Sequence, residues 1–151
     1  AYLANDLGGA VDLYIELLRE KGISVKHIQN AGDAIAEFKH IPYDAIGMDL
    51  HITTGLDCND EELRAYAHRS EFGQIGLQVI TRTRSDTSIN QKTPMSVVCH
   101  YQEEGGYSLL PNARKLSLEA GANDYFNPIT MPANFSQIIV DTIAAHATRE
   151  C

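Results

Sequence analysis

The sequence predicts a three-layer α/β fold, in which helices cover both faces of a sheet of five parallel strands. Short apolar runs alternate along the chain with segments whose apolar residues recur at helical spacing. Over the first third of the chain the order is β-α-β-α-β, which favours a parallel sheet with right-handed crossovers. The apolar run within residues 43–51 is continuous rather than alternating, as in strands that are buried on both faces.

Composition limits the classes of protein to which the chain can belong. Its 151 residues suffice for one domain with an ordinary core. With 44% hydrophobic and 21% charged residues it is neither disordered nor membrane-spanning, and we expect a cytoplasmic protein without a membrane partner. A net charge of −8 argues against nucleic-acid binding. The three cysteines have no close spacing, which argues against a disulfide framework or structural zinc.

The first half of the chain predicts three strands and two helices. Strands are expected at 2–5 and 23–28, and a third ends at Asp49. Gly22 is expected to stop the first helix, and Asn30 to cap the second. The residues expected on the buried faces are Val11, Tyr14, Ile15 and Leu18 in the first helix, and Ala31, Ala34, Ile35 and Phe38 in the second.

The second half is less regular. The segment 55–93 is longer than a simple crossover needs, so we interpret residues 56–74 as an insertion within a single domain that spans 1–151. The later elements are expected as a helix at 75–84, strands at 94–99 and 123–126, a helix at 112–120 that Gly121 stops, and a final helix whose first turn lies near Pro132. That final helix is expected to bury Phe135, Ile138, Ile139 and Ile143.

Asp49 is the first candidate for a functional residue. It comes at the end of an apolar run, and turn-prone residues follow it. In open α/β sheets, ligands bind outside the carboxyl ends of the strands, where the strand order reverses. An aspartate there can also simply end a strand or cap the next turn. Taken alone, the stretch leaves both interpretations open.

Two segments in their sequence context point to a known family. The first is YDAIGMDLH at residues 43–51, and the second is EAGANDY at residues 119–125, which leads into the fifth strand. Together with the order of the other elements, they resemble the CheY-like receiver domain of two-component response regulators. The resemblance covers nearly the whole chain outside the 56–74 segment. It implies a flavodoxin-like, doubly wound sheet with the strand order 2-1-3-4-5.

The resemblance also implies a phosphoryl-transfer site. By position, Asp49 is the phospho-acceptor, and a Mg²⁺ ion offsets the charge of the transferring group. The ligands of that ion would be Asp6, Asp49 and the backbone carbonyl of His51, with a weak contribution from Asn5. Beyond phosphorylating itself from a phosphodonor, the domain is expected to have no enzymatic activity.

Several positions depart from the family pattern and predict a weakened site. Asn5 stands where the family usually has the first of two acids. Cys99 occupies the position of the switch Ser or Thr, and a thiol is a poor hydrogen-bond donor. The next position, normally small, is His100. The Lys after the fifth strand is replaced by Asn127 or Pro128, depending on a one-residue gap, and neither carries a charge.

The family's signalling role implies partners. These are a histidine kinase or phosphotransfer protein, and an output domain or partner contacted through the helix at 112–120, the strand at 123–126 and the final helix; a homodimer is a further candidate. Tyr125 matches the aromatic switch position, although a tyrosine late in a strand is equally an ordinary core residue. The alternative is a phosphorylation-independent pseudo-receiver that acts as a protein interaction module. Asp6 and Asp49 favour the receiver, whereas Cys99 and the missing Lys favour the alternative.

Overall fold

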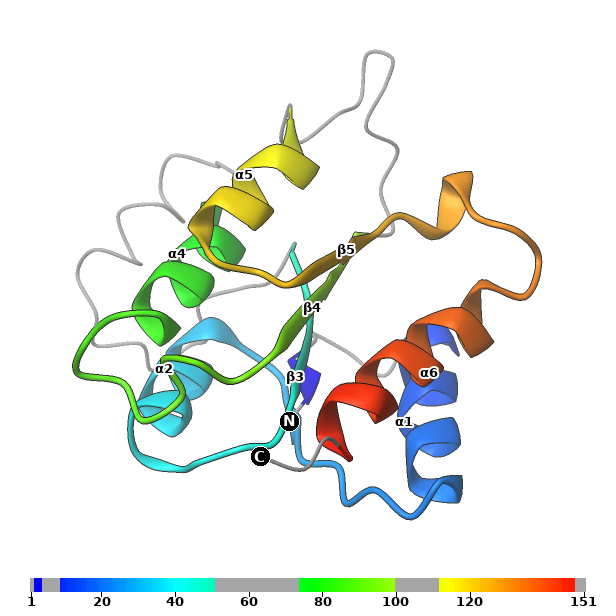
Figure 1. Cartoon of the computed structure of the whole chain (residues 1–151), viewed down its shortest axis with the longest axis horizontal. Helices are drawn as coiled ribbons and strands as arrows, with labels where there is room; N and C mark the ends of the chain where they lie inside the picture. The colour runs from blue at the N-terminus through cyan, green and yellow to red at the C-terminus, as the bar shows by residue number, and fades with distance from the viewer. Residues whose placement is uncertain (1, 4–8, 51–73, 100–111, 149–151) are drawn as a thin grey trace.

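A central parallel sheet separates two layers of helices (Figure 1). The computed structural model describes residues 2–3, 9–50, 74–99 and 112–148. Within these residues the strand order is β2-β1-β3-β4-β5, and every neighbouring pair is parallel. The predicted α/β class is confirmed, and the strand order is the one expected. Figure 1 shows α1 and α6 on one face of the sheet, and α2, α4 and α5 on the other.

The strands are short, and their register aligns residues across the sheet. They are β1 (Tyr2–Leu3), β2 (His27–Ile28), β3 (Ile46–Asp49), β4 (Met95–Val98) and β5 (Asp124–Phe126). Tyr2 pairs with Gly47, Gly47 with Ser96, and Ser96 with Asp124. Because side chains alternate between the faces of a strand, the members of such a row lie on one face. Asp49, two residues beyond Gly47, lies on that same face.

The helices follow from local signals in most cases. They are α1 (Gly9–Glu20), α2 (Ala31–His40), α4 (Gln74–Thr83), α5 (Ala113–Ala120) and α6 (Phe135–Ala147), with a 3-10 turn, η1 (Pro128–Thr130), after β5. The predicted cap of α2 is confirmed, since Asn30 accepts a hydrogen bond from the backbone N–H of Asp33 at 2.9 Å. Gly121 follows α5 with a φ of 126°, which a side chain would strain.

Each layer has its own core. Ile46 and Met48 of β3 face α2, α4 and α5, where Phe38 and Ile80 are also buried. Ala45 faces α1 and α6, together with a second set of buried side chains. The main members of this set are Tyr2, Val11, Tyr14, Ile15, Leu18, Val98, Ile139, Val140 and Ile143. The strand that carries Asp49 is therefore held from both sides, which fixes the backbone at the site.

Three local predictions were wrong in detail. The second strand is limited to His27–Ile28, because the described part of β1 pairs with only those two residues. Ile35 is half-buried, so the buried face of α2 is narrower than expected. The final helix begins at Phe135, after Pro132, and it buries Ile139, Val140, Ile143 and Ala144, whereas Phe135 and Ile138 lie at its margin.

Part of the predicted insertion falls outside the described residues. Gln74, assigned to it from the sequence, is the first residue of α4, and residues 56–73 are not described. The single-domain interpretation remains a prediction. Within the described residues, no helix is long and apolar enough to cross a bilayer.

Candidate functional site

Asp49 is the last residue of β3, at the carboxyl edge of the sheet. It lies between the positions of β1 and β4 and pairs with Val98. Its side chain is partly exposed, whereas Met48 and Leu50 on either side of it are fully buried. The carboxylate is therefore open to solvent on a backbone that packing holds in place. The position of Asp49 at the end of its strand is the one expected from the sequence.

The predicted metal site is described only in part. Asn5, Asp6 and His51 lie outside the described residues, so their role as ligands stays a prediction. Within the described residues, no cluster of three or more His, Cys, Asp or Glu side chains could hold a metal ion. Asp49 itself offers the hard oxygen atoms that Mg²⁺ prefers.

Cys99 and Asn127 are neighbours at the carboxyl edge, one residue beyond the paired Val98 and Phe126. The backbone N–H of Cys99 donates to the carbonyl oxygen of Phe126 at 2.8 Å, which extends the ladder by one bond. The Cys99 side chain is buried. His100, which follows it, lies outside the described residues.

Asn127 has a structural role at the position where the family pattern has a Lys. Its side-chain oxygen accepts the backbone N–H of Ile129 at 3.1 Å and so caps η1, and the residue is buried. Pro128, the other alignment of the Lys, is the first residue of η1. Neither alignment therefore places a cationic side chain at this position of the chain.

Tyr125 lies in the middle of β5 and is buried in the core that α2, α4 and α5 cover. Strand alternation puts it on the face of the sheet opposite to Asp49. An effect of Asp49 on Tyr125 must therefore pass around or through the sheet, rather than across one layer.

Two tyrosines that sequence reasoning did not assign to the site share the layer of Asp49. Tyr2 and Tyr14 are both buried, and their ring centroids are 6.1 Å apart. Burial and then the charge of Asp49 raise the pKa of Tyr14 to about 12. The same two causes, in that order, raise the pKa of Tyr2 well above its usual value. The sequence held one signal of this arrangement, because Gly47 inside a strand often marks a close approach.

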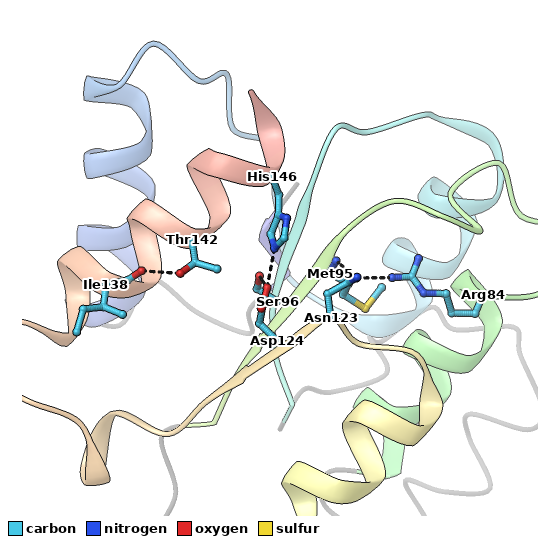
Figure 2. A network of polar contacts seen from close by, with 8 residues as sticks. All are labelled: Arg84, Met95, Ser96, Asn123, Asp124, Ile138, Thr142 and His146. Carbon is cyan, nitrogen blue, oxygen red and sulfur yellow. Dashed lines mark hydrogen bonds and ion pairs between the residues drawn. The ribbon is translucent and has the colours of Figure 1, made fainter. Parts of the chain in front are cut away.

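A second polar group lies at the opposite end of the sheet (Figure 2). The Asp124 carboxylate accepts the Ser96 hydroxyl at 2.9 Å and contacts His146 Nε2 at 2.7 Å. Asp124 and His146 are 22 positions apart in the chain, so no local pattern in the sequence pairs them. Ser96 donates to the aspartate and not to the histidine, so the group lacks the serine–histidine contact of a nucleophilic site. The contacts among Ser96, Asp124 and His146 join α6 to β4 and β5.

Next to it, Arg84 joins α4 to the start of β5 (Figure 2). Its guanidinium donates to the side-chain oxygen of Asn123 at 3.0 Å and to the carbonyl oxygen of Gly121 at 2.9 Å. The same Asn123 oxygen accepts the backbone N–H of Met95 at 2.9 Å. Burial lowers the pKa of Arg84. These bonds fix the frame on which Tyr125 and Asn127 are placed.

Comparison with known proteins links this architecture to receiver domains. No family model matches the sequence, and no curated protein sequence matches it. Solved structures, in contrast, match the fold of this chain. A response regulator from Hahella chejuensis has a TM-score of 0.63 and 18% identity, covering 99% of this chain and 97% of its own. A CheY-like receiver domain protein from Methanospirillum hungatei has a TM-score of 0.60 and 14% identity, with 96% and 93% covered.

A third structure was solved with a metal ion. It is the receiver domain of a sensor histidine kinase from Pseudomonas aeruginosa, with a magnesium ion coordinated in the active-site cleft. Its TM-score is 0.57 at 18% identity, and 95% of each chain is covered. At such identities the likeness concerns the fold: this chain folds as response regulator receiver domains do.

Proposed function

We propose that this domain is a receiver of two-component signalling, in which Asp49 accepts a phosphoryl group from a histidine kinase or phosphotransfer protein. The observation that supports it most is the position of Asp49. It is an accessible carboxylate at the carboxyl end of the central strand, in the fold that receiver domains share. The proposal includes a cytoplasmic location and a single domain that spans 1–151.

For phosphoryl transfer, the main task of the protein is to position the Asp49 carboxylate. A carboxylate oxygen of Asp49 attacks the phosphorus of a phosphohistidine, the P–O bond forms as the P–N bond breaks, and the imidazole leaves. A divalent cation, when bound, offsets the charge of the transferring group. Asp49 and Asp6 would hold it, with the His51 carbonyl and Asn5. One structural relative with a magnesium ion, and a response regulator, Rcp1, in a manganese-bound form, support this ligand class.

We also propose that the switch is weak. The Cys99 thiol donates poorly, and Asn127 is engaged in capping η1, so neither offers a strong bond to a phosphoryl group. Tyr125, the proposed aromatic switch residue, lies in the other layer.

The proposed partner surface is formed by α5, β5 and α6, for an output domain, a partner protein or a second copy of the chain. Two of the large apolar side chains that are exposed within the described residues flank β5. They are Leu118 on α5, 38% exposed, and Ile129 on η1, 56% exposed. A protein contact over these elements would bury both side chains.

The second candidate is the phosphorylation-independent interaction module. Its support is that Asn127 and Pro128, the two alignments of the family's Lys, carry no charge, and that a thiol, Cys99, stands at the switch position. In this case the fold and the surface on α5, β5 and α6 are used, but Asp49 is never modified.

Phosphorylation in vitro separates the two candidates. The protein is incubated with Mg²⁺ and a small phosphodonor or a phosphorylated histidine kinase, and its intact mass is measured. The receiver proposal expects one added phosphoryl group, which maps to Asp49 and is absent in Asp49→Asn. Asp44→Asn, two residues before the same strand begins, is the matched control and should be modified like the wild type. An unmodified wild type with both donors supports the interaction module instead.

A further inference from the structure

One buried polar atom near the site has no partner. The hydroxyl of Tyr2 is enclosed in the layer between the sheet, α1 and α6, and it makes no hydrogen bond. Buried polar groups are nearly always paired, because an unpaired one loses its bond to water and gains nothing in return. An orphaned hydroxyl in the first strand therefore calls for an explanation.

The register places Tyr2 on the same face of the sheet as Asp49, one strand away. Tyr2 pairs with Gly47, and a Cβ atom built on Gly47 would lie 2.8 Å from the Tyr2 ring. The ring thus lies over the one position of β3 that has no side chain. Asp49 is two residues further along the same face, and diagonal neighbours at that spacing are within reach of an aromatic side chain. Burial and, after it, the negative charge of Asp49 raise the pKa of Tyr2.

A purely space-filling role explains the ring but not the hydroxyl. Phenylalanine would cover Gly47 equally well and would leave no orphaned atom. The surroundings also keep the phenol protonated, since burial and the Asp49 charge both raise its pKa. The Tyr2 hydroxyl is therefore a hydrogen-bond donor without an acceptor. It lies in the same layer as the Asp49 carboxylate, which becomes phosphorylated in the proposed function.

We propose that the Tyr2 hydroxyl donates a hydrogen bond to the phosphorylated side chain of Asp49, and so takes part of the role for which the family pattern has a cation and a hydroxyl. This inference rests on the proposed function, in which Asp49 becomes phosphorylated. Phosphorylation lengthens the Asp49 side chain and adds three acceptor oxygens. The bond thus forms only in the modified state, and it stabilises that state without drawing on Cys99 or Asn127.

The test compares Tyr2→Phe with the wild type in three measurements: thermal unfolding of the free protein, affinity for beryllofluoride with Mg²⁺, and the lifetime of the phosphorylated form. We expect Tyr2→Phe to unfold at a higher temperature, because the orphaned hydroxyl is gone. Its beryllofluoride affinity and phosphoryl lifetime should fall roughly tenfold, the usual effect of losing a hydrogen bond to a charged group. Tyr43→Phe is the control: it removes a phenol that is bonded to Glu37 on the other face, and should leave both ligand measurements unchanged.

A label on the wild type gives an independent reading. With tyrosine labelled at the ring carbon that carries the hydroxyl, the Tyr2 resonance should shift when beryllofluoride binds, and the Tyr43 resonance should not. A stabilised Tyr2→Phe with unchanged ligand affinity, or a Tyr2 resonance that does not move, overturns the inference and leaves the receiver proposal standing. A wild type that binds neither phosphoryl group nor beryllofluoride overturns both.

Discussion

Glu37 is a residue whose surroundings set its charge. Its carboxylate accepts hydrogen bonds from Lys26 Nζ at 2.7 Å and from the Tyr43 hydroxyl at 2.6 Å. The bond from Lys26 and then that from Tyr43 lower the pKa of Glu37. The same carboxylate raises the pKa of Tyr43, after the effect of burial. The three side chains join the start of β2 to α2 and to the chain that enters β3.

The lowered pKa of Glu37 predicts a pH dependence of stability. A carboxylate with a depressed folded pKa contributes stability that is present above its unfolded pKa, about 4.3, and is lost as pH falls through the folded value. We expect Tyr43→Phe to weaken this contribution, so that stability falls less steeply in acid. Urea unfolding between about pH 6 and pH 3 measures it. Lys39→Met, which removes a different cation from α2, should keep the wild-type slope; equal slopes in all three proteins would contradict the assignment.

Two glycines with positive φ predict different costs of substitution. Gly22 has a φ of 83° and open space around it, whereas a Cβ on Gly121 would lie 2.6 Å from Arg84 Cγ. Gly22→Ala should cost about 1–2 kcal/mol, the backbone strain alone. Gly121→Ala should cost more, because Arg84 must also move and its bond to the Gly121 carbonyl is disturbed. Denaturant unfolding of the pair is the measurement, and similar values would show that Arg84 adapts freely.

At the scale of elements, the turn between α4 and β4 is tied to the turn between α2 and β3. Asn90, which is fully buried, donates to the carbonyl oxygens of Phe38 at 2.8 Å and Ile41 at 2.7 Å. It accepts the Tyr43 N–H and the Thr93 hydroxyl, both at 2.9 Å. One amide thus satisfies its two donors and two acceptor sites, and it holds the entrance to β3.

Asn90→Asp is expected to disrupt this junction although it changes few atoms. The variant loses both N–H donors and sets a carboxylate against two carbonyl oxygens, which should destabilise the protein by about 3 kcal/mol at neutral pH. The loss should shrink in acid, as the new carboxyl group becomes protonated. Asn134→Asp, at the exposed start of α6, is the matched change and should alter stability by less than about 0.5 kcal/mol. An equal effect of the two changes in unfolding experiments would refute the role of Asn90.

Signals contained in a few consecutive residues were predicted well from the sequence. Asn30 caps α2 and Gly121 ends α5, because capping depends on neighbours along the chain. Asp49 was placed correctly at the end of β3, since a buried strand followed by turn residues is also local. The misses depend on long-range contacts. His146 and Tyr2 each have a role that is set by a different strand, and no spacing within the sequence encodes that.

For the whole molecule, the division into two layers decides how the site can act. Asp49, Tyr2 and Tyr14 belong to the layer of α1 and α6, whereas Tyr125 belongs to the layer of α2, α4 and α5. We expect a conformational effect of Asp49 on Tyr125 to pass along the carboxyl edge of the sheet, at Cys99. A donor such as Tyr2 can stabilise a modified Asp49 within its own layer. Tyr125 lies in the other layer, across the sheet from Tyr2.

Weak Mg²⁺ binding is predicted for the carboxyl edge. Two carboxylates near one another repel, and a divalent cation relieves that repulsion, so Asp49→Asn should remove most of the affinity. Calorimetric or fluorescence titration with Mg²⁺ measures this. Asp44→Asn, which removes the same charge just before β3 begins, should bind Mg²⁺ like the wild type. Wild type and Asp49→Asn with equal affinity would exclude Asp49 from the metal site.

The last prediction concerns how far modification of Asp49 changes the conformation. A ligand shifts an equilibrium only through its differential interaction with the two states. A hydrogen bond to a charged group contributes roughly 1.5–3 kcal/mol, so each missing contact at Cys99 or Asn127 removes about tenfold or more of the bias. We therefore expect binding of partners to α5, β5 and α6 to depend little on phosphorylation.

Beryllofluoride and amide chemical shifts test this directly. In the wild type, shifts should be large near Asp49 and small at Tyr125. In Cys99→Thr combined with Asn127→Lys, a hydroxyl and a cation return to these two positions, and the shifts at Tyr125 should grow even though η1 loses its cap from Asn127. Asn127→Ala, which removes the cap without adding a charge, separates the loss of the cap from the gain of the cation. Large, saturable shifts at Tyr125 in the wild type would mean that the missing contacts are supplied by other residues and that the switch is intact.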